Sequence, residues 1–331
     1  MPDRIALVVP REGSGARLDR FLALCLAVSR SELQRWIAAG RVSVAGVAKG
    51  SSTRLREGDR VVVEPPPPPA IDALPDEGVH FDVLHVDDEL VVVDKPAGVV
   101  VHPARGHAQG TLVNGLLALG LFSRAAFEGE HEGHVRPGIV HRLDKGTSGV
   151  MVVARTPEAQ RALASQFRAH TIERVYEALV VGAARDGTFD TLHGRHPRDR
   201  LRFTTRPRSG KRAVTHVRVI ARLHGTTHVA CTLETGRTHQ IRVHLAESGT
   251  PVLGDALYGK RSRDERVQAA AERLGHQALH ARVLGFVHPG TGTAMRFETP
   301  PPEDFRDALR SLAGDGGGAA DAGAVRGSGR R

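Results

Sequence analysis

Residues 141–149 read His141-Arg142-Leu143-Asp144-Lys145-Gly146-Thr147-Ser148-Gly149, a polar segment between two short apolar runs. Ile139-Val140 precedes it and Val150-Met151-Val152-Val153 follows it, so we expect a loop between two strands. Asp144 is the one carboxylate of this loop, and its cationic neighbours Arg142 and Lys145 favour its ionised form. Such a carboxylate can act as a base, nucleophile or ion-pair partner, since catalytic groups often lie on loops held by rigid strands. The alternative is an Asx turn, in which Asp144 only accepts hydrogen bonds from nearby backbone N–H groups.

The composition is that of a basic chain long enough for about two domains. It has 331 residues, a net charge of +9, a pI near 10.4 and a hydrophobic content of 40%. The charge favours a polyanionic partner, nucleic acid before a membrane. Two cysteines, Cys25 and Cys231, are too few for a disulfide framework, and we expect both to be buried small residues in a reducing cytosol. No apolar run approaches the roughly 18 residues that a membrane-spanning helix needs.

The N-terminal part of the chain predicts a small independent unit. Apolar residues recur at helical spacing from Leu18 to Leu26. A second helix is expected to begin at Ser29, with Glu32 completing a capping box and Gly40 as C-cap. Short strands follow, at 42–44 and 60–63. Two basic helices on a small sheet suit RNA, and a solvated charged face is the alternative.

The order of residues in this unit resembles the S4 RNA-binding domain. The resemblance implies RNA contacts, for which we expect Arg17, Arg30, Arg35 and Arg41. The sequence departs from the family at Ala45, where Asn usually precedes Gly46; because the position lies in a turn, we expect little effect. The residues that carry the resemblance are Arg17-Leu18-Asp19-Arg20-Phe21, Ser29-Arg30-Ser31, Ile37, Gly40-Arg41-Val42-Ser43-Val44 with Gly46, and Gly58-Asp59.

Four segments are expected along the chain. Residues 12–64 form the S4-like domain. Residues 65–75 are a linker, because the prolines from Pro65 to Pro69 are extended and stiff. Residues 76–310 form a catalytic domain, and residues 311–331 are a disordered tail rich in Gly, Ala, Asp and Arg.

The larger domain predicts an α+β fold. A hairpin is expected over 81–94, helices over 111–119, from 156 through 167 and over 238–247, and strands over 174–181, 214–223 and 227–233. Strands occur in clusters without regular βαβ alternation, which favours a mixed, largely antiparallel central sheet flanked by helices and loops.

Two further segments are candidates for chemistry. If the chain is helical after Gly236, Thr238 and Arg242 share a face, and Arg242 can form a bidentate pair with a distant carboxylate; the alternative is a solvated surface helix. Strand alternation places Tyr176 on one face with Arg174. That tyrosine is either core with its hydroxyl at the rim or, beside an RNA site, a platform for a base.

A run of basic residues between 195 and 212 is predicted to bind phosphate, with Arg202, Arg206 and Lys211 as candidates. No cofactor or metal site is expected. Residues 254–260 nearly match a P-loop, but Arg261 replaces the Ser or Thr that would hold magnesium.

Taken together, these motifs resemble the RluA-type pseudouridine synthases, and their match covers residues 79–305. The fused S4-like domain resembles the branch of that family that modifies large-subunit ribosomal RNA. The motifs are Asp94-Lys95-Pro96-Ala97-Gly98 with Val101-His102-Pro103; Gly138-Ile139-Val140 with residues 141–149; Tyr176; Arg237-Thr238-His239-Gln240-Ile241-Arg242-Val243-His244; Gly254-Asp255 with Tyr258-Gly259; and Ala278-Leu279-His280-Ala281 with His288-Pro289.

The resemblance implies a pseudouridine synthase fold and isomerisation of uridine to pseudouridine in RNA, without a cofactor. It implies that Asp144 is the essential carboxylate, that Arg242 orients it and that Tyr176 stacks on the flipped uracil. Arg142 would fill the gap left in the RNA, and Leu279 would line the pocket. Ribosomal RNA, free or in an assembling particle, would be the partner of a cytoplasmic monomer that contacts no membrane.

Two other functions stay open from the sequence. One is a non-catalytic RNA-binding factor of ribosome assembly. The other is a hydrolase that uses Ser148, although Gly149 follows Ser148 directly and breaks the G-x-S-x-G pattern.

Overall fold

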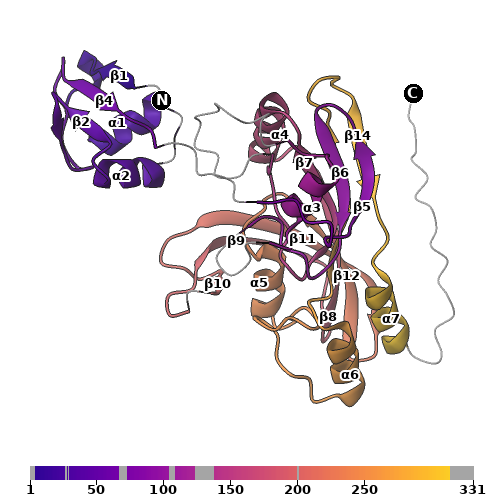
Figure 1. Cartoon of the computed structure of the whole chain (residues 1–331). Coiled ribbons are helices and arrows are strands. Elements are labelled where there is room, and N and C mark those ends of the chain that lie inside the picture. The colour runs from indigo at the N-terminus through magenta and orange to yellow at the C-terminus, as the bar shows by residue number, and fades with distance from the viewer. Residues whose placement is uncertain are drawn as a thin grey trace, which may run out of the picture. The chain divides into compact units, whose positions relative to one another are not determined.

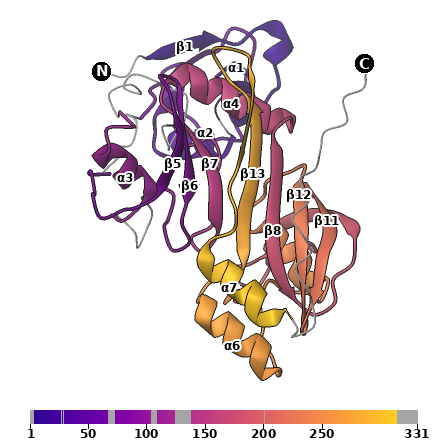
Figure 2. The same cartoon turned by 90° about the vertical axis from the view of Figure 1, so that its right-hand side faces the viewer.

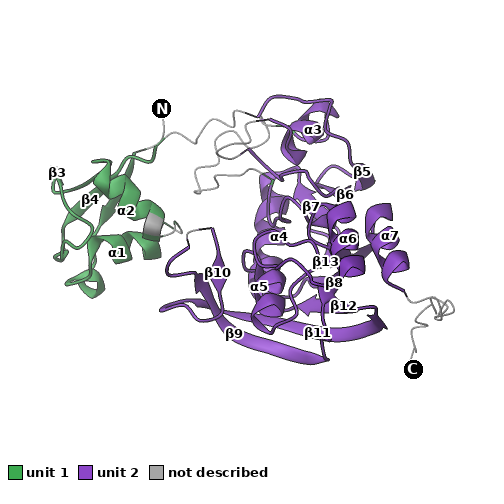
Figure 3. Ribbon diagram, turned by 90° about the horizontal axis from the view of Figure 1, so that it is seen from below, with its two compact units in different colours: residues 1–72, 123–138 green, residues 73–122, 139–331 purple. Residues whose placement is uncertain are grey.

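The computed structural model describes residues 4–26, 28, 30–66, 73–103, 109–123, 138–199 and 201–313. The chain divides into two compact units (Figure 3), one of residues 1–72 with 123–138 and the other of residues 73–122 with 139–331. Ser29 and residues 314–331 of the expected 311–331 tail lie outside the described residues. Residues 311 and 312 are helical, so the tail was predicted to begin too early. No helix among the described residues is long and apolar enough to cross a membrane.

The N-terminal unit is a small sheet covered by two helices. Its sheet has the order β1-β4-β2-β3 and is antiparallel throughout. Leu18, Leu22, Leu33 and Trp36 bring the buried faces of the helices into one core with the strands. The elements are β1 (Ile5–Val8), η1 (Arg11–Gly13), α1 (Leu18–Cys25), α2 (Arg30–Ala38), β2 (Val42–Val44), β3 (Val47–Ala48) and β4 (Arg60–Val63).

A buried carboxylate joins the two helices of this unit. Asp19 has no exposed side-chain surface and accepts hydrogen bonds from Arg17, Arg30 and Gln34. Burial alone would raise the pKa of Asp19, but the hydrogen bonds, that from Arg17 first, hold it well below its usual range. Two of the arginines expected to contact RNA, Arg17 and Arg30, therefore also hold the fold together.

The larger unit is built on one ten-stranded sheet (Figures 1 and 2) with the order β10-β9-β11-β12-β8-β13-β7-β6-β5, and β14 pairs with β13. Among the described residues β7 and β13 run parallel, and the other neighbouring strands are antiparallel. The strands are β5 (Asp82–Val86), β6 (Leu90–Lys95), β7 (Ser148–Ala154), β8 (Glu173–Val181), β9 (Gly187–Arg195), β10 (Phe203–Thr204), β11 (Lys211–Leu223), β12 (Thr226–Leu233), β13 (Leu279–Val287) and β14 (Ala294–Glu298).

Helices cover this sheet around two apolar clusters. In one cluster α4 packs on β6, β7 and β13, and Leu163 is fully buried there. In the other, α5, α6 and α7 pack on β8 and β12, with Phe305 at the centre. The helices are α3 (Leu112–Ala118), α4 (Pro157–Ala169), α5 (Gln240–Glu247), α6 (Glu265–Leu274) and α7 (Glu303–Leu312).

The structure confirms the predicted α+β class and most of the expected elements, and it corrects three details. Ile139 makes only an isolated bridge to Val153, so the described residues 138–140 directly before the 141–149 loop form no strand. Thr238 lies outside α5, which begins at Gln240, because His239 takes a left-handed φ of 59°. Cys25 is exposed, while Cys231 is buried.

The hairpin from β2 to β3 contains the residue at which the sequence departs from the S4 family. Val44 pairs with Val47, so Ala45 and Gly46 form a two-residue turn, with φ of 50° and 81°. Positive φ at both positions defines a type I′ turn, in which Asn is favoured at the first position. A left-handed conformation costs an alanine on the order of 1 kcal/mol.

We predict that Ala45→Asn raises the free energy of unfolding of the N-terminal unit by about 0.5–1 kcal/mol, because asparagine tolerates this conformation better. Trp36 is the one tryptophan of the chain and lies in this unit's core. Urea unfolding followed by its fluorescence therefore reports on this unit. Ala48→Asn, an exposed change in β3, is the control. An equal gain in both variants, or none in either, would contradict the turn argument.

Candidate active site

The 141–149 loop is fixed at its end by an unusually close strand contact. Gly149 pairs with Ala281 where β7 runs parallel to β13. A Cβ at Gly149 would lie 2.2 Å from the carbonyl oxygen of Ala281, and the φ of Gly149 is 120°. Only glycine fits both constraints. The loop closes with the N–H of Thr147 bonded to the carbonyl of Asp144 at 3.0 Å.

One arginine lies between two carboxylates at the centre of the site. Arg242 donates from Nη1 to Oδ2 of Asp144 at 2.7 Å. Its Nε and Nη2 donate to the two oxygens of Asp255, at 2.7 and 2.8 Å. The side chain of Asp255 is fully buried, whereas 18% of the Asp144 side chain is exposed. Arg242 is therefore anchored by the buried Asp255, and it holds Asp144 where part of that side chain stays exposed to solvent.

The charges in this cluster stabilise one another. Burial alone would raise the pKa of Asp255, but the hydrogen bonds from Arg242 outweigh burial and lower it. Burial alone would lower the pKa of Arg242, but Asp255 and then Asp144 raise it. The backbone N–H groups of Leu257 and Tyr258 also donate to Asp255. The 254–259 segment that resembled a P-loop thus forms the support of this carboxylate.

A second contact reaches Asp144 from His239, which the sequence reasoning did not single out. Nε2 of His239 lies 3.7 Å from Oδ1 of Asp144, the oxygen that Arg242 does not bind. Nδ1 of His239 lies 2.9 Å from the hydroxyl of Tyr258, which accepts the N–H of Phe203 at 2.9 Å. Among the described residues Nδ1 of His239 is the one acceptor near the phenol proton, so we infer that the hydroxyl donates to Nδ1. The ring proton of a neutral His239 is then on Nε2, which faces Asp144.

Tyr176 and Leu279 lie on neighbouring strands near this cluster. Tyr176 is on β8 and pairs with Ala281 of β13, while Leu279 begins β13 and is 5% exposed. Burial first, and then Asp144, raise the pKa of Tyr176 to about 12. The phenol is therefore protonated at neutral pH and lies within electrostatic reach of Asp144.

Lys95 is a buried cation beside the loop that the sequence gave no reason to expect inside the protein. Its Nζ donates to the carbonyls of Pro96 at 2.7 Å and Val99 at 2.9 Å. The N–H of Gly98 in turn donates to the carbonyl of Lys145 at 2.7 Å. Burial lowers the pKa of Lys95 to about 7, against the attraction of Asp144 and Asp94.

Two further polar side chains of the loop, His141 and Ser148, support it from inside. His141 accepts the N–H of Val152 at Nε2 and stacks on Phe167. Burial first, and then Arg174, lower the pKa of His141 to about 3, so it is neutral. Ser148 lies 2.9 Å from Nδ1 of His280, and the two are 3% and 0% exposed. A serine enclosed in this way cannot reach a substrate, which removes the nucleophile of the hydrolase hypothesis.

The basic segment from 195 to 212 forms the hairpin of β9, β10 and the start of β11. Arg206 and Lys211 are exposed, and the guanidinium of Arg202 lies 5.2 Å from the ring centre of Tyr258. The N–H of Phe203 bonds to Tyr258, so this hairpin is attached to the site. Arg142 is exposed beside Asp144. In the N-terminal unit Arg35 is exposed and Arg41 is half-buried.

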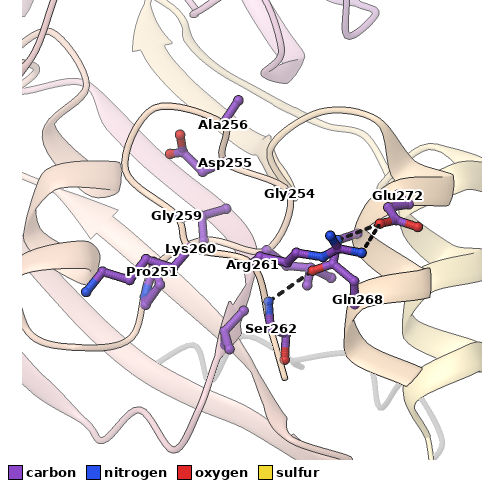
Figure 4. Close-up of a pocket in the computed structure, with 14 residues that line it drawn as sticks. Pro251, Gly254, Asp255, Ala256, Gly259, Lys260, Arg261, Ser262, Gln268 and Glu272 are labelled. Atoms are coloured by element: carbon purple, nitrogen blue, oxygen red, sulfur yellow. Dashed lines mark hydrogen bonds and ion pairs between the residues drawn. The ribbon is translucent and has the colours of Figure 1, made fainter. Parts of the chain in front are cut away.

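A pocket of about 380 Å³ lies beside the loop that carries Asp255 (Figure 4), between this loop and α6. Its charged groups are partly paired: Arg261 lies 3.9 Å from Glu272, and Gln268 bonds to Glu272 and to the N–H of Ser262. No three His, Cys, Asp or Glu side chains within the described ranges group closely enough to hold a metal ion.

Comparisons with known proteins assign sequence families to both units. The RNA pseudouridylate synthase family matches residues 89–247, and the S4 domain matches residues 16–61. The chain is 42% identical to the RNA pseudouridine synthase YlyB of Bacillus subtilis, covering 95% of this chain and 100% of that one. It is 43% identical to ribosomal large subunit pseudouridine synthase D of Xanthomonas campestris, covering 95% and 94%.

A solved structure has a similar fold. Human RNA pseudouridylate synthase domain containing 4 superposes with a TM-score of 0.52 at 25% identity, over 70% of this chain and 92% of that one. The similarity therefore extends from the sequence to the sheet that carries the site.

We predict that Lys95 makes stability depend on pH. Between about pH 7 and the ordinary lysine pKa of 10.5 the unfolded chain binds a proton that the folded chain has released, so stability rises with pH. Relative to Lys95→Met, the wild-type free energy of unfolding should increase across this window, measured by urea titration with circular dichroism. For Lys260→Met, a change at an exposed site, the free energy of unfolding should depend on pH as in the wild type. The same pH dependence in Lys95→Met as in the wild type would rule out the role of Lys95.

Proposed function

The chain belongs to the RNA pseudouridine synthase family, and we propose that it isomerises specific uridines of large-subunit ribosomal RNA. The observation that carries this proposal is the anchored pair of Asp144 and Arg242, in which 18% of the Asp144 side chain stays exposed. The relatives named ribosomal large subunit pseudouridine synthase D support the choice of RNA, because they match almost the whole chain.

The reaction rearranges bonds within one nucleotide. The N1–C1′ bond of uridine breaks, the base rotates, and a C5–C1′ bond forms as the proton on C5 moves to solvent and N1 gains one. No electrons leave the nucleotide, so no redox cofactor takes part. The target base must first leave its stack to reach a carboxylate within the protein.

Asp144 is the essential carboxylate of this proposal. It either attacks C1′ or removes a ribose proton, and in both routes Nη1 of Arg242 holds Oδ2 of this carboxylate in place. Because Asp255 anchors Arg242, the carboxylate is held in place before the substrate arrives.

Three further residues are proposed to hold the flipped uridine. Tyr176 stacks on the uracil, which suits a phenol that stays protonated at neutral pH. Leu279 forms an apolar wall, and the exposed Arg142 fills the gap in the RNA.

RNA selection is assigned to basic residues in both units. We propose residues 12–64 as the RNA-binding domain, 65–75 as its linker and the unit that begins at residue 76 and includes α7 as the catalytic domain, in a protein that acts as a cytoplasmic monomer. Phosphate contacts add affinity without sequence information, so several contacts spread over both units suit a large folded RNA. The proposed contacts are Arg17, Arg30, Arg35 and Arg41 in the first domain and Arg202, Arg206 and Lys211 in the catalytic domain.

The first test is tritium release from large-subunit ribosomal RNA labelled at C5 of uridine. The wild type should release tritium, and Asp144→Asn should release none above background, because the change removes the charge and keeps the shape. Asp88→Asn, an exposed change in a turn, should behave as the wild type. No release by the wild type would contradict the proposed reaction, and equal release by Asp144→Asn would contradict the role of Asp144.

A second test concerns the contact of His239 with Asp144. We predict that Tyr258→Phe lowers kcat about five- to tenfold, the effect of losing the one hydrogen bond of roughly 1 kcal/mol that orients the imidazole. The change also removes the acceptor of the Phe203 N–H in the proposed RNA-binding hairpin, so the KM for RNA is measured separately from kcat, and circular dichroism should show an intact fold. Single-turnover rates that equal the wild type would show that the hydroxyl does not position Asp144.

A further inference from the structure

Arg174 is a buried cation that the reaction proposed above does not use. It lies on β8, two residues before Tyr176, and is 6% exposed. Its Nη2 donates to the carbonyls of Glu234 at 2.7 Å and Leu233 at 3.5 Å. Its guanidinium also lies 5.7 Å from the ring centre of Phe167. These contacts place the side chain firmly but use only part of its donors.

The charge of Arg174 is not neutralised within the described part of the chain. Burial lowers the pKa of Arg174, and the charged or polar groups that act on it are Tyr176 and Arg237, neither of them a carboxylate. Nε is buried and has no hydrogen-bond partner in the described residues. A buried cation without a counter-ion is costly, and buried charges in proteins are normally paired. The unpaired charge therefore calls for an anion from outside.

The open end of the guanidinium lies against Gly236. A Cβ at Gly236 would lie 2.6 Å from Nη1 of Arg174, and the φ of this glycine is not in the left-handed region. The residue is therefore small because the guanidinium needs the space, not because the backbone needs the freedom. Gly236 is itself exposed, so Nη1 lies directly beneath an exposed piece of backbone that carries no side chain.

A second arginine lies beside the first. Arg237 follows Gly236, is half-buried, and donates from Nε to the carbonyl of Arg212 at 3.2 Å. Its positive charge disfavours the charged form of Arg174, so the two guanidinium groups are close enough to repel each other. Two such groups on either side of an exposed glycine form a site that an anion stabilises.

We propose that Arg174 and Arg237, on either side of Gly236, bind a phosphodiester of the RNA next to the uridine held by Tyr176. This rests on the proposed function, which makes RNA the substrate. Phosphate suits the site because a guanidinium offers parallel N–H donors that match two phosphate oxygens. A contact of this kind fixes the backbone of the flipped nucleotide and carries no sequence information.

The test measures RNA binding in the Asp144→Asn background, so that binding is read separately from chemistry. The probe is large-subunit ribosomal RNA transcript, titrated over a range of salt. Arg174→Gln should weaken binding about tenfold or more and lower the log–log salt slope by about one, the effect of one lost phosphate contact. Arg296→Gln, which removes an arginine already paired with Glu173 and Glu298, should leave the slope unchanged.

Methylphosphonates, which are uncharged replacements for phosphodiesters, show which phosphate of the RNA Arg174 contacts. In a short RNA around one uridine that the wild type modifies, methylphosphonates replace the phosphates one at a time. One position next to that uridine should weaken binding to the Arg174-containing protein, and the same replacement should cost the Arg174→Gln variant nothing further. If Arg174→Gln fails to fold by circular dichroism, Gly236→Ala takes its place, because the methyl group displaces Nη1 and keeps the charge.

The outcomes separate this proposal from the proposed function. An unchanged salt slope, with the same methylphosphonate profile in variant and wild type, would overturn the phosphate site and leave Arg174 as a structural group. A wild type that binds RNA but releases no tritium would overturn the isomerisation, while the salt slope would still decide the role of Arg174.

Discussion

The guanidinium of Arg242, held between a buried and a half-buried carboxylate, is the interaction on which the rest of the site depends. Asp255 takes two of its donors and leaves Nη1 for Asp144. A buried ion pair of this kind is weak evidence of stability, because desolvation offsets much of the attraction. Its value here is geometric, since it fixes the position of Asp144, the carboxylate that we propose meets the substrate.

The surrounding fold serves this geometry from two sides. On the sheet side, Gly149 lets β7 approach β13, and Lys95 binds the carbonyls of the neighbouring 96–99 segment. On the other side, His239 is the residue directly before α5 and has a left-handed backbone conformation. Its ring points toward Asp144. Tyr258 then joins that ring to the basic hairpin through the N–H of Phe203. The 141–149 loop and the proposed RNA-binding hairpin are thus connected by the 3.7 Å contact of His239 with Asp144 and by two hydrogen bonds of the Tyr258 hydroxyl.

The sequence predicted what local patterns determine. The helix after Thr156 follows from its N-cap and the helical spacing of its apolar residues. The 141–149 loop follows from the apolar runs beside it, and the α+β class follows from strands that occur in clusters along the chain. It could not show that Asp255 anchors an arginine, because the pair Asp144 and Arg242 joins residues 98 positions apart and Asp255 approaches from a third segment. The strand β9 was missed because two of its more buried positions, Thr191 and His193, are polar, so its burial alternates and its hydrophobicity does not. Cys25 was misplaced because it ends α1 on its exposed side.

We propose that Arg242 positions Asp144 for the chemical step. The most direct test is the single-turnover rate of tritium release for Arg242→Lys, which keeps the charge and loses the fork that binds two carboxylates at once. RNA affinity and the folded state are measured in parallel by filter binding and circular dichroism. We expect a single-turnover rate at least about a hundredfold lower than that of the wild type, because the preorganised orientation of Asp144 is lost, and an RNA affinity that is nearly unchanged. A rate within about threefold of the wild type would contradict it.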